Sequence, residues 1–420
     1  MSLLVYRIVK LWKTAGSSLR LKLIQLWWGK LSGGILMRLI LLSLVLTSLN
    51  ALATPGDLVS FQEVRNKADA AITTIRSRFC PAVNNSPKAI ESTRYSVTFK
   101  TKDLKGNEVQ SAGFFVVPQN PDAHGLVVYQ HGTLFGRSEL PSSYPEYGEA
   151  DALRYCFASL GYVAMSADYL GYGDGTGIHP YLHPESEAWV ARDMMRAVSS
   201  ALKQLSVPVN GKLFLAGYSQ GGQAAMALLR FLEQDPAHEF TVTAAAPMAG
   251  PYSLVEVAPA LMKNPSEHTA SEASYIVLGL GQVFPLYKNL NEVFLPPYDT
   301  QIEALFDGSH DWHSVLKVLT LPIDVLFQPD FINGLVNNPN APLMQAFQTI
   351  RLDMWAPKTP VNLYHGAADM EVPFAISQIA YKNMKTLGGN VNLINLGANI
   401  DHAKGFPLAV GAAALWFETF

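Results

Sequence analysis

Cysteine and charge are both scarce in this chain. Only two of its 420 residues are cysteine, and 15% are charged, with a formal net charge of −3. The folded part contains no run of lysine or arginine, which argues against a nucleic-acid partner. The histidines lack the spacing of a zinc site and no glycine-rich phosphate loop is present, so we expect neither a metal nor a cofactor. A small neutral or apolar partner molecule suits this composition better.

The beginning of the chain has the pattern of an export signal. Residues 1–36 carry six lysines and arginines among leucines and tryptophans, and form either a basic membrane-surface segment or an upstream stretch that is not translated. Met37 and Arg38 precede an apolar run over 39–49 and small residues ending at Ala53, which predicts a signal peptide over 37–53. Because the run is too short to span a membrane, we expect an exported protein, periplasmic or secreted, with no stable membrane span.

The two cysteines, Cys80 and Cys156, both follow this signal. In an oxidising compartment, two cysteines with no third partner most simply form one disulfide. Two buried free thiols are the alternative, since small buried side chains are what free cysteines usually are. Neither cysteine stands in a catalytic context.

The order of hydrophobic patterns predicts a mostly parallel sheet. Residues 54–92 show helical spacing and then loop composition, whereas 95–100 and 111–118 indicate two antiparallel strands. From residue 126, short apolar runs alternate with helical stretches, which calls for a twisted parallel sheet with helices on both faces. The predicted strands of this part are 126–130, 162–167, 213–218, 242–248, 361–366 and 391–396.

The alternation stops between residues 254 and 355. This stretch shows helical fragments at 271–284, 291–306 and 343–354 and no clear apolar strand. It predicts an inserted helical cap over the strand ends, with a helical satellite packed elsewhere as the alternative. The α/β core then comprises 54–253 and 356–420.

The stretch 213–225 carries the clearest functional signal. An apolar strand ends in Gly217-Tyr218-Ser219-Gln220-Gly221 and passes directly into a helical run of small residues. Glycine two positions before and after the serine leaves room for the returning backbone, so Ser219 can stand exposed on a strained strand-to-helix turn. A structural turn with an ordinary serine is the alternative.

A reactive serine needs a base to take its proton and a carboxylate to orient that base. Among the ten histidines, His402 alone lies in the loop predicted after the last strand, and Asp369 follows the preceding strand. The chain order serine, aspartate, histidine is the one that α/β hydrolases use. Asp401 and Glu371 are rival carboxylates, but Asp401 is adjacent to His402, and neighbouring side chains on a loop rarely face each other.

Four further motifs stand at predicted strand ends: His131-Gly132-Thr133, Asp168-Tyr169-Leu170-Gly171-Tyr172-Gly173, Tyr364-His365-Gly366-Ala367-Ala368-Asp369 with Val372-Pro373, and Asp401-His402. Together with the serine turn they resemble the α/β-hydrolase superfamily, and the insertion and export signal are most similar to secreted lipases and esterases. The resemblance covers residues 95–420. It implies Ser219 as nucleophile, His402 as general base and then acid, and Asp369 as the residue that orients His402.

Two backbone N–H groups should stabilise the negative charge of a tetrahedral intermediate. One is predicted at Gln220, at the start of a helix, and the second at Thr133, with Leu134 as runner-up. Tyr169 and Tyr172 either contact the substrate or belong to a packed structural loop.

These residues predict a serine hydrolase that cleaves carboxylic esters through an acyl-enzyme, acting on a small-molecule ester or lipid. A serine peptidase of the same fold, resembling aminopeptidases, is the alternative, because the same three residues serve amides. A non-catalytic binding protein on this scaffold is a more distant one. The oligomeric state is left open.

Overall fold

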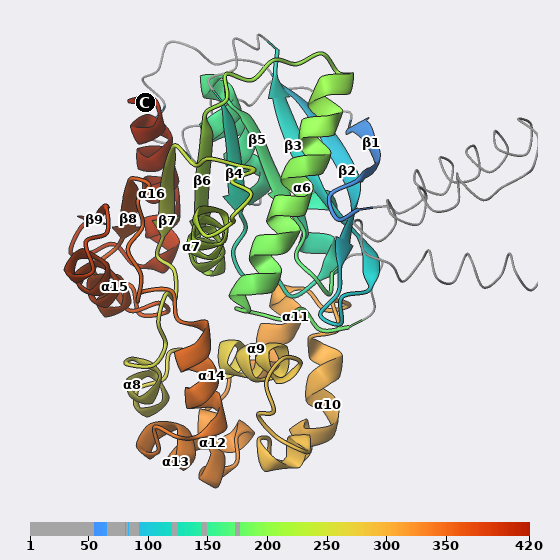
Figure 1. Ribbon diagram of the computed structural model, residues 1–420. Coiled ribbons are helices and arrows are strands. Elements are labelled where there is room, and N and C mark those ends of the chain that lie inside the picture. Colours follow the sequence, from blue (N-terminus) through green and yellow to red (C-terminus); the bar gives the residue numbers. More distant parts are fainter. Residues whose placement is uncertain are drawn as a thin grey trace, which may run out of the picture. The chain divides into compact units, whose positions relative to one another are not determined.

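The computed structural model describes one compact unit within Thr54–Phe420 (Figure 1). The predicted segment 1–36 and signal peptide 37–53 lie outside the described residues. No described helix is both long and apolar enough to cross a membrane. The structure describes residues 54–64, 80, 83, 92–119, 125–143, 149–172 and 177–420.

A nine-stranded sheet forms the centre of the described unit, in the order β1-β2-β3-β5-β4-β6-β7-β8-β9. Strands β1, β2, β3 and β5 pair antiparallel, whereas β5, β4, β6, β7, β8 and β9 run parallel. This confirms the mostly parallel sheet predicted from the sequence. The strands are β1 (Leu58–Val64), β2 (Ser92–Lys102), β3 (Glu108–Pro118), β4 (Leu126–Gln130), β5 (Val163–Ala167), β6 (Leu213–Tyr218), β7 (Ala244–Met248), β8 (Val361–His365) and β9 (Val391–Asn395).

Strand β6 separates two hydrophobic cores. Leu213 and Leu215 pack into one core, and Phe214 and Ala216 into the other, because successive side chains of a strand point to opposite faces. Helices cover both faces, as predicted. The first face carries α6 (Pro184–Gln204), α7 (Gln220–Glu233) and α15 (Phe374–Thr386); the second carries α16 (His402–Phe417) and the short turns α5 (Glu149–Ala152), η4 (Leu153–Phe157) and η5 (Ala158–Leu160).

Seven helices lie between β7 and β8 and are called the helical insertion below. Figure 1 shows them gathered at one end of the sheet. One isolated bridge, between Phe294 and Phe327, is the only strand-like pairing among them. The predicted fragments correspond to α9, α10 and α14, while the other four helices were not predicted. The seven are α8 (Ala258–Lys263), α9 (Thr269–Gly281), α10 (Tyr298–Leu305), α11 (Trp312–Leu319), α12 (Ile323–Leu326), α13 (Pro329–Asn337) and α14 (Pro342–Ile350).

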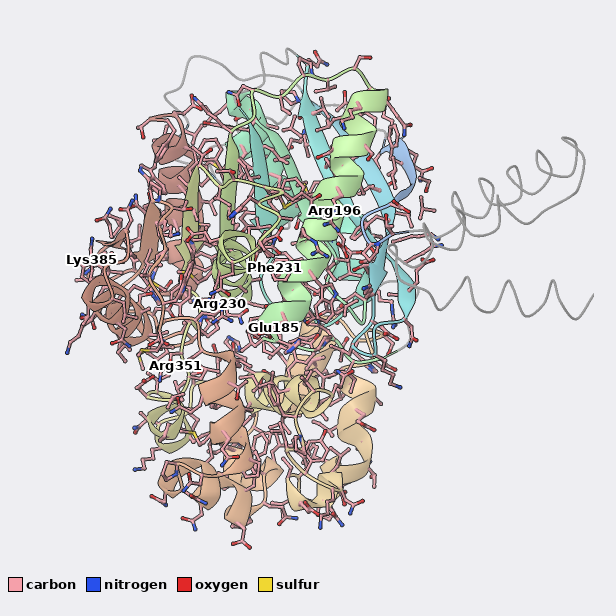
Figure 2. All side chains as sticks on the ribbon, viewed as in Figure 1. Glu185, Arg196, Arg230, Phe231, Arg351 and Lys385 are labelled. Carbon is pink, nitrogen blue, oxygen red and sulfur yellow. A yellow bond between two sulfur atoms is a disulfide. The ribbon has the colours of Figure 1, made fainter. Side chains whose placement is uncertain are left out.

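A network of charged and amide side chains joins the two ends of the helical insertion. After α14, Arg351 donates to both carboxylate oxygens of Asp353 at 2.8 Å and, at 2.8 Å, to Glu256, which precedes α8. Asn383 of α15 donates to Asp353 at 2.6 Å, and Arg230 of α7 donates to the carbonyl of Arg351 at 3.0 Å. Figure 2 shows Arg230 and Arg351 side by side. Both ends of the insertion are therefore attached to each other and to the core.

The N-terminal segment differs from the prediction. The helix predicted there is wrong over Leu58–Val64, which forms the edge strand β1, antiparallel to β2. A register shift between Leu58 and Ser60 leaves Leu58, Phe61 and Val64 as the partly buried positions, three residues apart. A bulge can thus imitate helical spacing in the sequence. Residues 65–79 lie outside the described residues.

Cys80 and Cys156 form a disulfide across 76 residues of sequence, with their Cα atoms 5.7 Å apart. We expect the double substitution Cys80→Ala and Cys156→Ala to lower the free energy of unfolding by about 2–5 kcal/mol, because the cross-link restricts the unfolded chain. Guanidinium unfolding of the oxidised wild type and the double variant measures this. An unchanged midpoint and slope would contradict a stabilising role for the bond.

Candidate active site

Ser219 occupies a strained turn between β6 and α7. Its φ of 59° and ψ of −125° lie where residues other than glycine are rare, at a cost of about 1–3 kcal/mol. A side chain at Gly217 would collide with the carbonyl of Gly221, and one at Gly221 with the carbonyl of Gln130. Glycine at both positions therefore lets the helix leave the strand at a sharp angle, with Ser219 at the tip.

Asp369, in the loop after β8, is held by four hydrogen-bond donors. His402 Nδ1–H donates to Asp369 Oδ2 at 2.6 Å, and the backbone N–H groups of Glu371 and Val372 donate to Oδ1 at 3.0 and 2.9 Å. Burial disfavours the charged form, but the hydrogen bonds from His365 and His402 outweigh it and lower the pKa of Asp369 to about 2. The carboxylate is therefore ionised at neutral pH.

His365 is a brace for this loop. Its Nε2 lies 2.8 Å from the carbonyl of Val372 and 3.1 Å from Asp369 Oδ2, so this nitrogen carries the hydrogen. Its Nδ1 accepts from the Ser377 hydroxyl at 2.7 Å. Because both ring nitrogens are engaged and the ring is fully buried, His365 has no free nitrogen for proton transfer.

His402 begins α16, so its predicted position in the preceding loop is wrong. Asp401 caps the helix by accepting the Lys404 N–H at 2.9 Å, which turns this rival carboxylate toward Lys404. Since His402 Nδ1–H points to Asp369, Nε2 carries the free lone pair. Burial lowers the pKa of His402, but the hydrogen bond and the charge of Asp369 raise it by more, so the pKa of His402 lies above its usual value.

Tyr218 brings His402 to the serine turn. The Tyr218 hydroxyl donates to the carbonyl of His402 at 2.7 Å, and the two ring centroids are 5.0 Å apart. Tyr218 directly precedes Ser219, so the imidazole and the serine lie at the same strand end. The Ser219 hydroxyl makes no hydrogen bond to another described residue. Hydrogen bonds between a nucleophile and its base are often long in the absence of substrate.

A carboxyl group that sequence analysis missed holds the loop after β4. Glu149 Oε2 accepts the Gly132 N–H and the Tyr129 hydroxyl, both at 2.9 Å. A side chain on Gly132 would meet Glu149 Oε1 at 2.6 Å, so the carboxyl group packs directly against the glycine. Burial raises the pKa of Glu149 to about 7. The two hydrogen bonds and the charge of His402 lower this pKa, but by less than burial raises it. Glu149 belongs to no motif, and no sequence signal marked it.

The same loop presents two backbone N–H groups without acceptors. Glu139 accepts the N–H groups of Phe135 and Gly136 at 3.2 and 3.0 Å. The N–H groups of Thr133 and Leu134 meet no acceptor among the described residues. The two predicted alternatives for a donor in this loop are therefore both available.

Tyr169 and Tyr172 are buried, and their hydroxyl groups contact backbone carbonyls of this loop. The Tyr169 hydroxyl donates to the carbonyl of His131 at 2.9 Å, and its ring stacks on the His131 ring. The Tyr172 hydroxyl contacts the carbonyl of Leu134 and the hydroxyl of Tyr275. Since both hydroxyl groups are engaged within the protein, we assign the pair to the packed-loop alternative and propose no substrate contact for them.

The side chain of Gln220 enters a buried polar cluster beneath the turn. Its amide nitrogen lies 2.7 Å from His179 Nε2 and donates to Glu187 Oε1 at 2.7 Å. His179 Nδ1 donates to the carbonyl of Leu170 at 2.8 Å. Burial lowers the pKa of His179 to about 3 and raises that of Glu187 well above its usual range, so burial favours the neutral form of both groups. The cluster anchors the first residue of α7.

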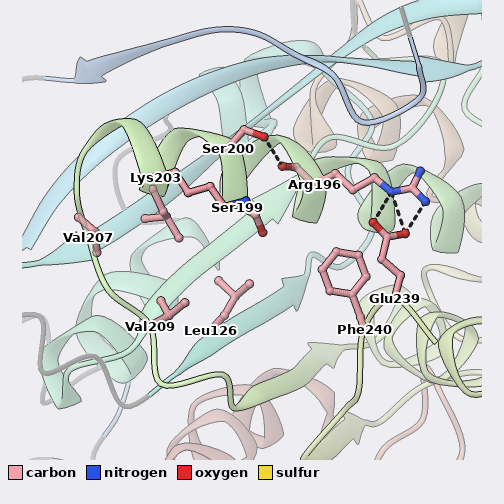
Figure 3. A pocket seen from close by; sticks show the side chains of 10 residues that line it. Leu126, Arg196, Ser199, Ser200, Lys203, Val207, Val209, Glu239 and Phe240 are labelled. Carbon is pink, nitrogen blue, oxygen red and sulfur yellow. Dashed lines mark hydrogen bonds and ion pairs between the residues drawn. The ribbon is translucent and has the colours of Figure 1, made fainter. Parts of the chain in front are cut away.

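A small cavity reaches the loop of Asp369 at Glu371. Its volume is about 60 Å³, and it is lined by side chains of the helical insertion and by Glu371. A larger groove of about 470 Å³, shown in Figure 3, begins at Leu126, at the opposite end of β4 from the loop that carries Thr133. Its arginine, Arg196, is paired with Glu239 at 2.8 and 2.9 Å. In the part of the chain that is described, no cluster of three histidine, cysteine or acidic side chains is arranged to hold a metal ion.

Solved structures share this architecture, although no protein-family model and no curated protein matches the chain. A Legionella pneumophila protein provisionally named a hydrolase is 27% identical, with a TM-score of 0.80, covering 86% of this chain and 97% of that one. The rice cell wall degrading esterase LipA from Xanthomonas oryzae is 26% identical, with a TM-score of 0.76, covering 87% and 98%. Candida antarctica lipase A, at 14% identity and a TM-score of 0.60 over 83% and 78%, shares the fold.

The chain therefore has the α/β-hydrolase fold, as its motifs predicted. Its structural neighbours are lipase- and esterase-like members of that superfamily.

We expect Glu149→Ala to lower the free energy of unfolding by about 1–3 kcal/mol more than Glu149→Gln, because alanine leaves the Gly132 N–H and the Tyr129 hydroxyl without an acceptor. A glutamine oxygen can still accept from both. Urea unfolding of the two variants measures the difference. Equal losses would mean that these hydrogen bonds do not fix the loop.

Proposed function

We propose that this protein is a serine hydrolase that cleaves carboxylic esters through an acyl-enzyme, with Ser219 as nucleophile, His402 as base and Asp369 as its orienting carboxylate. The observation that carries the proposal is the 2.6 Å hydrogen bond between Asp369 and His402, next to the strained turn of Ser219. The esterases among the structural neighbours support ester bonds as the substrate class.

The geometry supports the following steps. His402 Nε2 takes the proton of Ser219 Oγ as this oxygen attacks the ester carbonyl carbon, and the resulting imidazolium is stabilised by the ionised Asp369. The imidazolium then gives the proton to the departing alcohol oxygen, which leaves Ser219 acylated. Water, deprotonated by His402, attacks the acyl carbon, and the carboxylic acid is released as Ser219 recovers its proton.

The backbone N–H of Gln220 is the first donor to the oxyanion, because the start of α7 also offers the positive end of a helix dipole. Thr133 N–H supplies the second, with Leu134 N–H as the alternative, since both lack acceptors among the described residues. The side-chain amide of Gln220 is held by His179 and Glu187, which keeps the first donor in place.

We further propose that the helical insertion, within 254–355, caps this site, and that 54–253 and 356–420 form the catalytic core. Support comes from the cavity that the insertion shares with Glu371 of the Asp369 loop. Export of the protein, after removal of residues 37–53, is compatible with the disulfide between Cys80 and Cys156.

Ser219→Ala should abolish hydrolysis of short-chain p-nitrophenyl esters, with a loss in kcat of about 10⁴-fold or more, because no other group can form the acyl-enzyme. Ser200→Ala is the matched control, since the Ser200 hydroxyl donates within α6 to the carbonyl of Arg196. A fluorophosphonate probe should label the wild type and the control but not Ser219→Ala. Full activity of Ser219→Ala would disprove the mechanism.

The two rival carboxylates should respond differently. Asp369→Asn should lower kcat by about 10³–10⁴-fold, because an amide no longer holds the productive tautomer of His402. Asp401→Asn should leave kcat within about threefold, since asparagine also caps a helix well. Steady-state kinetics on the same ester compare the two. A larger loss in Asp401→Asn than in Asp369→Asn would reverse the assignment.

A further inference from the structure

The cavity that reaches the Asp369 loop is apolar except for three polar side chains. Leu261 of α8, Ile276 of α9, Phe331 of α13 and Phe347 of α14 are among its lining residues. Two carboxyl groups also line it, Glu272 of α9 and Glu371 of the loop after β8, and a third polar group is Thr269. A carboxyl group in an apolar cavity is unfavourable unless something pairs with it.

Glu371 connects the cavity to the loop that carries Asp369. Its backbone N–H donates to Asp369 Oδ1 at 3.0 Å, so it sits within the loop that orients His402. Its carboxylate lies 3.9 Å from His268 Nε2, at the start of α9. A molecule in the cavity would therefore contact the loop that orients His402.

Glu272 faces the reacting groups from the helical insertion. Its carboxyl group makes no hydrogen bond or ion pair with another described residue. Burial, Glu371 and Asp369 raise its pKa to about 8, while His402 acts in the opposite direction. The charge of Glu272 also raises the pKa of Tyr181. The Tyr181 hydroxyl is 2.7 Å from Thr133 Oγ1 in the proposed oxyanion loop. The carboxyl group of Glu272 is thus within electrostatic reach of both sides of the proposed site.

We propose that Glu272 is a specificity-determining residue that binds a protonated amine on the acyl group of the substrate, so that short amino-acyl esters are the preferred class. The proposal rests on the ester hydrolysis inferred above. An ammonium group would supply the hydrogen bonds that the carboxyl group of Glu272 lacks and would favour the ionised form of that carboxyl group.

The acyl group suits this cavity better than the alcohol. The acyl group stays attached to Ser219 after the alcohol has left, so it needs a site that holds it through the second step. The volume of about 60 Å³ favours a short chain over a long one.

Ethyl esters of β-alanine and butyric acid test the proposal, because their acyl groups differ only in an ammonium in place of a methyl. We expect wild type to prefer the β-alanine ester, and Glu272→Gln to lower the ratio of the two kcat/KM values by about tenfold or more, chiefly through KM of the cationic ester. Glu267→Gln is the matched control, because Glu267 is exposed and near the same helix start. Its ratio should stay within about twofold of wild type.

The pH dependence gives a second readout. As pH rises through about 8, Glu272 becomes ionised and opposes the developing oxyanion, so hydrolysis of ethyl butyrate by wild type should fall. Glu371, Asp369, His402 and Tyr181 face the same carboxyl group and remain in the variant. The rate of Glu272→Gln should therefore not decline above pH 8. It should still rise with pH as His402 loses its proton.

The outcomes separate the specificity from the proposed function. Hydrolysis of ethyl butyrate together with no preference for the β-alanine ester, or an unchanged ratio in Glu272→Gln, would overturn the role of Glu272 alone. Failure of wild type to cleave either ester any faster than Ser219→Ala would overturn the ester hydrolase as well. Should Glu272→Gln not fold, inhibition of wild type decides: butylammonium should inhibit ethyl butyrate hydrolysis about tenfold more strongly than 1-pentanol, and equal inhibition would refute the proposal.

Discussion

The left-handed backbone at Ser219 is the constraint on which the rest of the site depends. Strand β6 can pass into α7 at this angle because glycines at 217 and 221 allow the chain to approach itself and the neighbouring strand β4 closely. Two full cores, one on each face of β6, hold the strand in place. The strain at one residue is thus carried by the packing of the whole sheet.

Around this turn, hydrogen-bond donors and neighbouring charges together set the pKa values of the buried carboxyl groups. Asp369 has four donors and a pKa of about 2, while Glu149 has two donors and a pKa of about 7. Glu272 has none among the described residues, and its pKa is about 8. Donors compensate for the loss of water, so each group receives the protonation state that its contacts determine. The carboxylate that contacts His402 Nδ1, that of Asp369, is therefore ionised at neutral pH.

Local patterns were enough to predict the fold and the serine turn. The strands at 126–130 and 213–218 match the apolar runs residue for residue, because glycine-rich or charged turns delimit both. The segment 58–64 was misread because a bulge gave a strand the spacing of a helix. Glu149 and Glu272 could not be predicted, since their importance arises from contacts between elements distant in the sequence and neither belongs to a motif. Spacing along the chain carries no record of such contacts.

The network around Arg351 and Asp353, which joins the two ends of the helical insertion, has an evolutionary consequence. Glu256 and Arg351 join the two ends of the helical insertion, and Arg230 and Asn383 attach these ends to the core. The chain therefore leaves and re-enters the sheet at one point. Helices of the insertion that do not contact the core can be lengthened or exchanged in a descendant while the reaction chemistry is inherited. Helix α9 is more constrained, because Tyr275 contacts Tyr172 beside the loop that carries Leu134. New substrate preferences can therefore arise from the outer helices of this region.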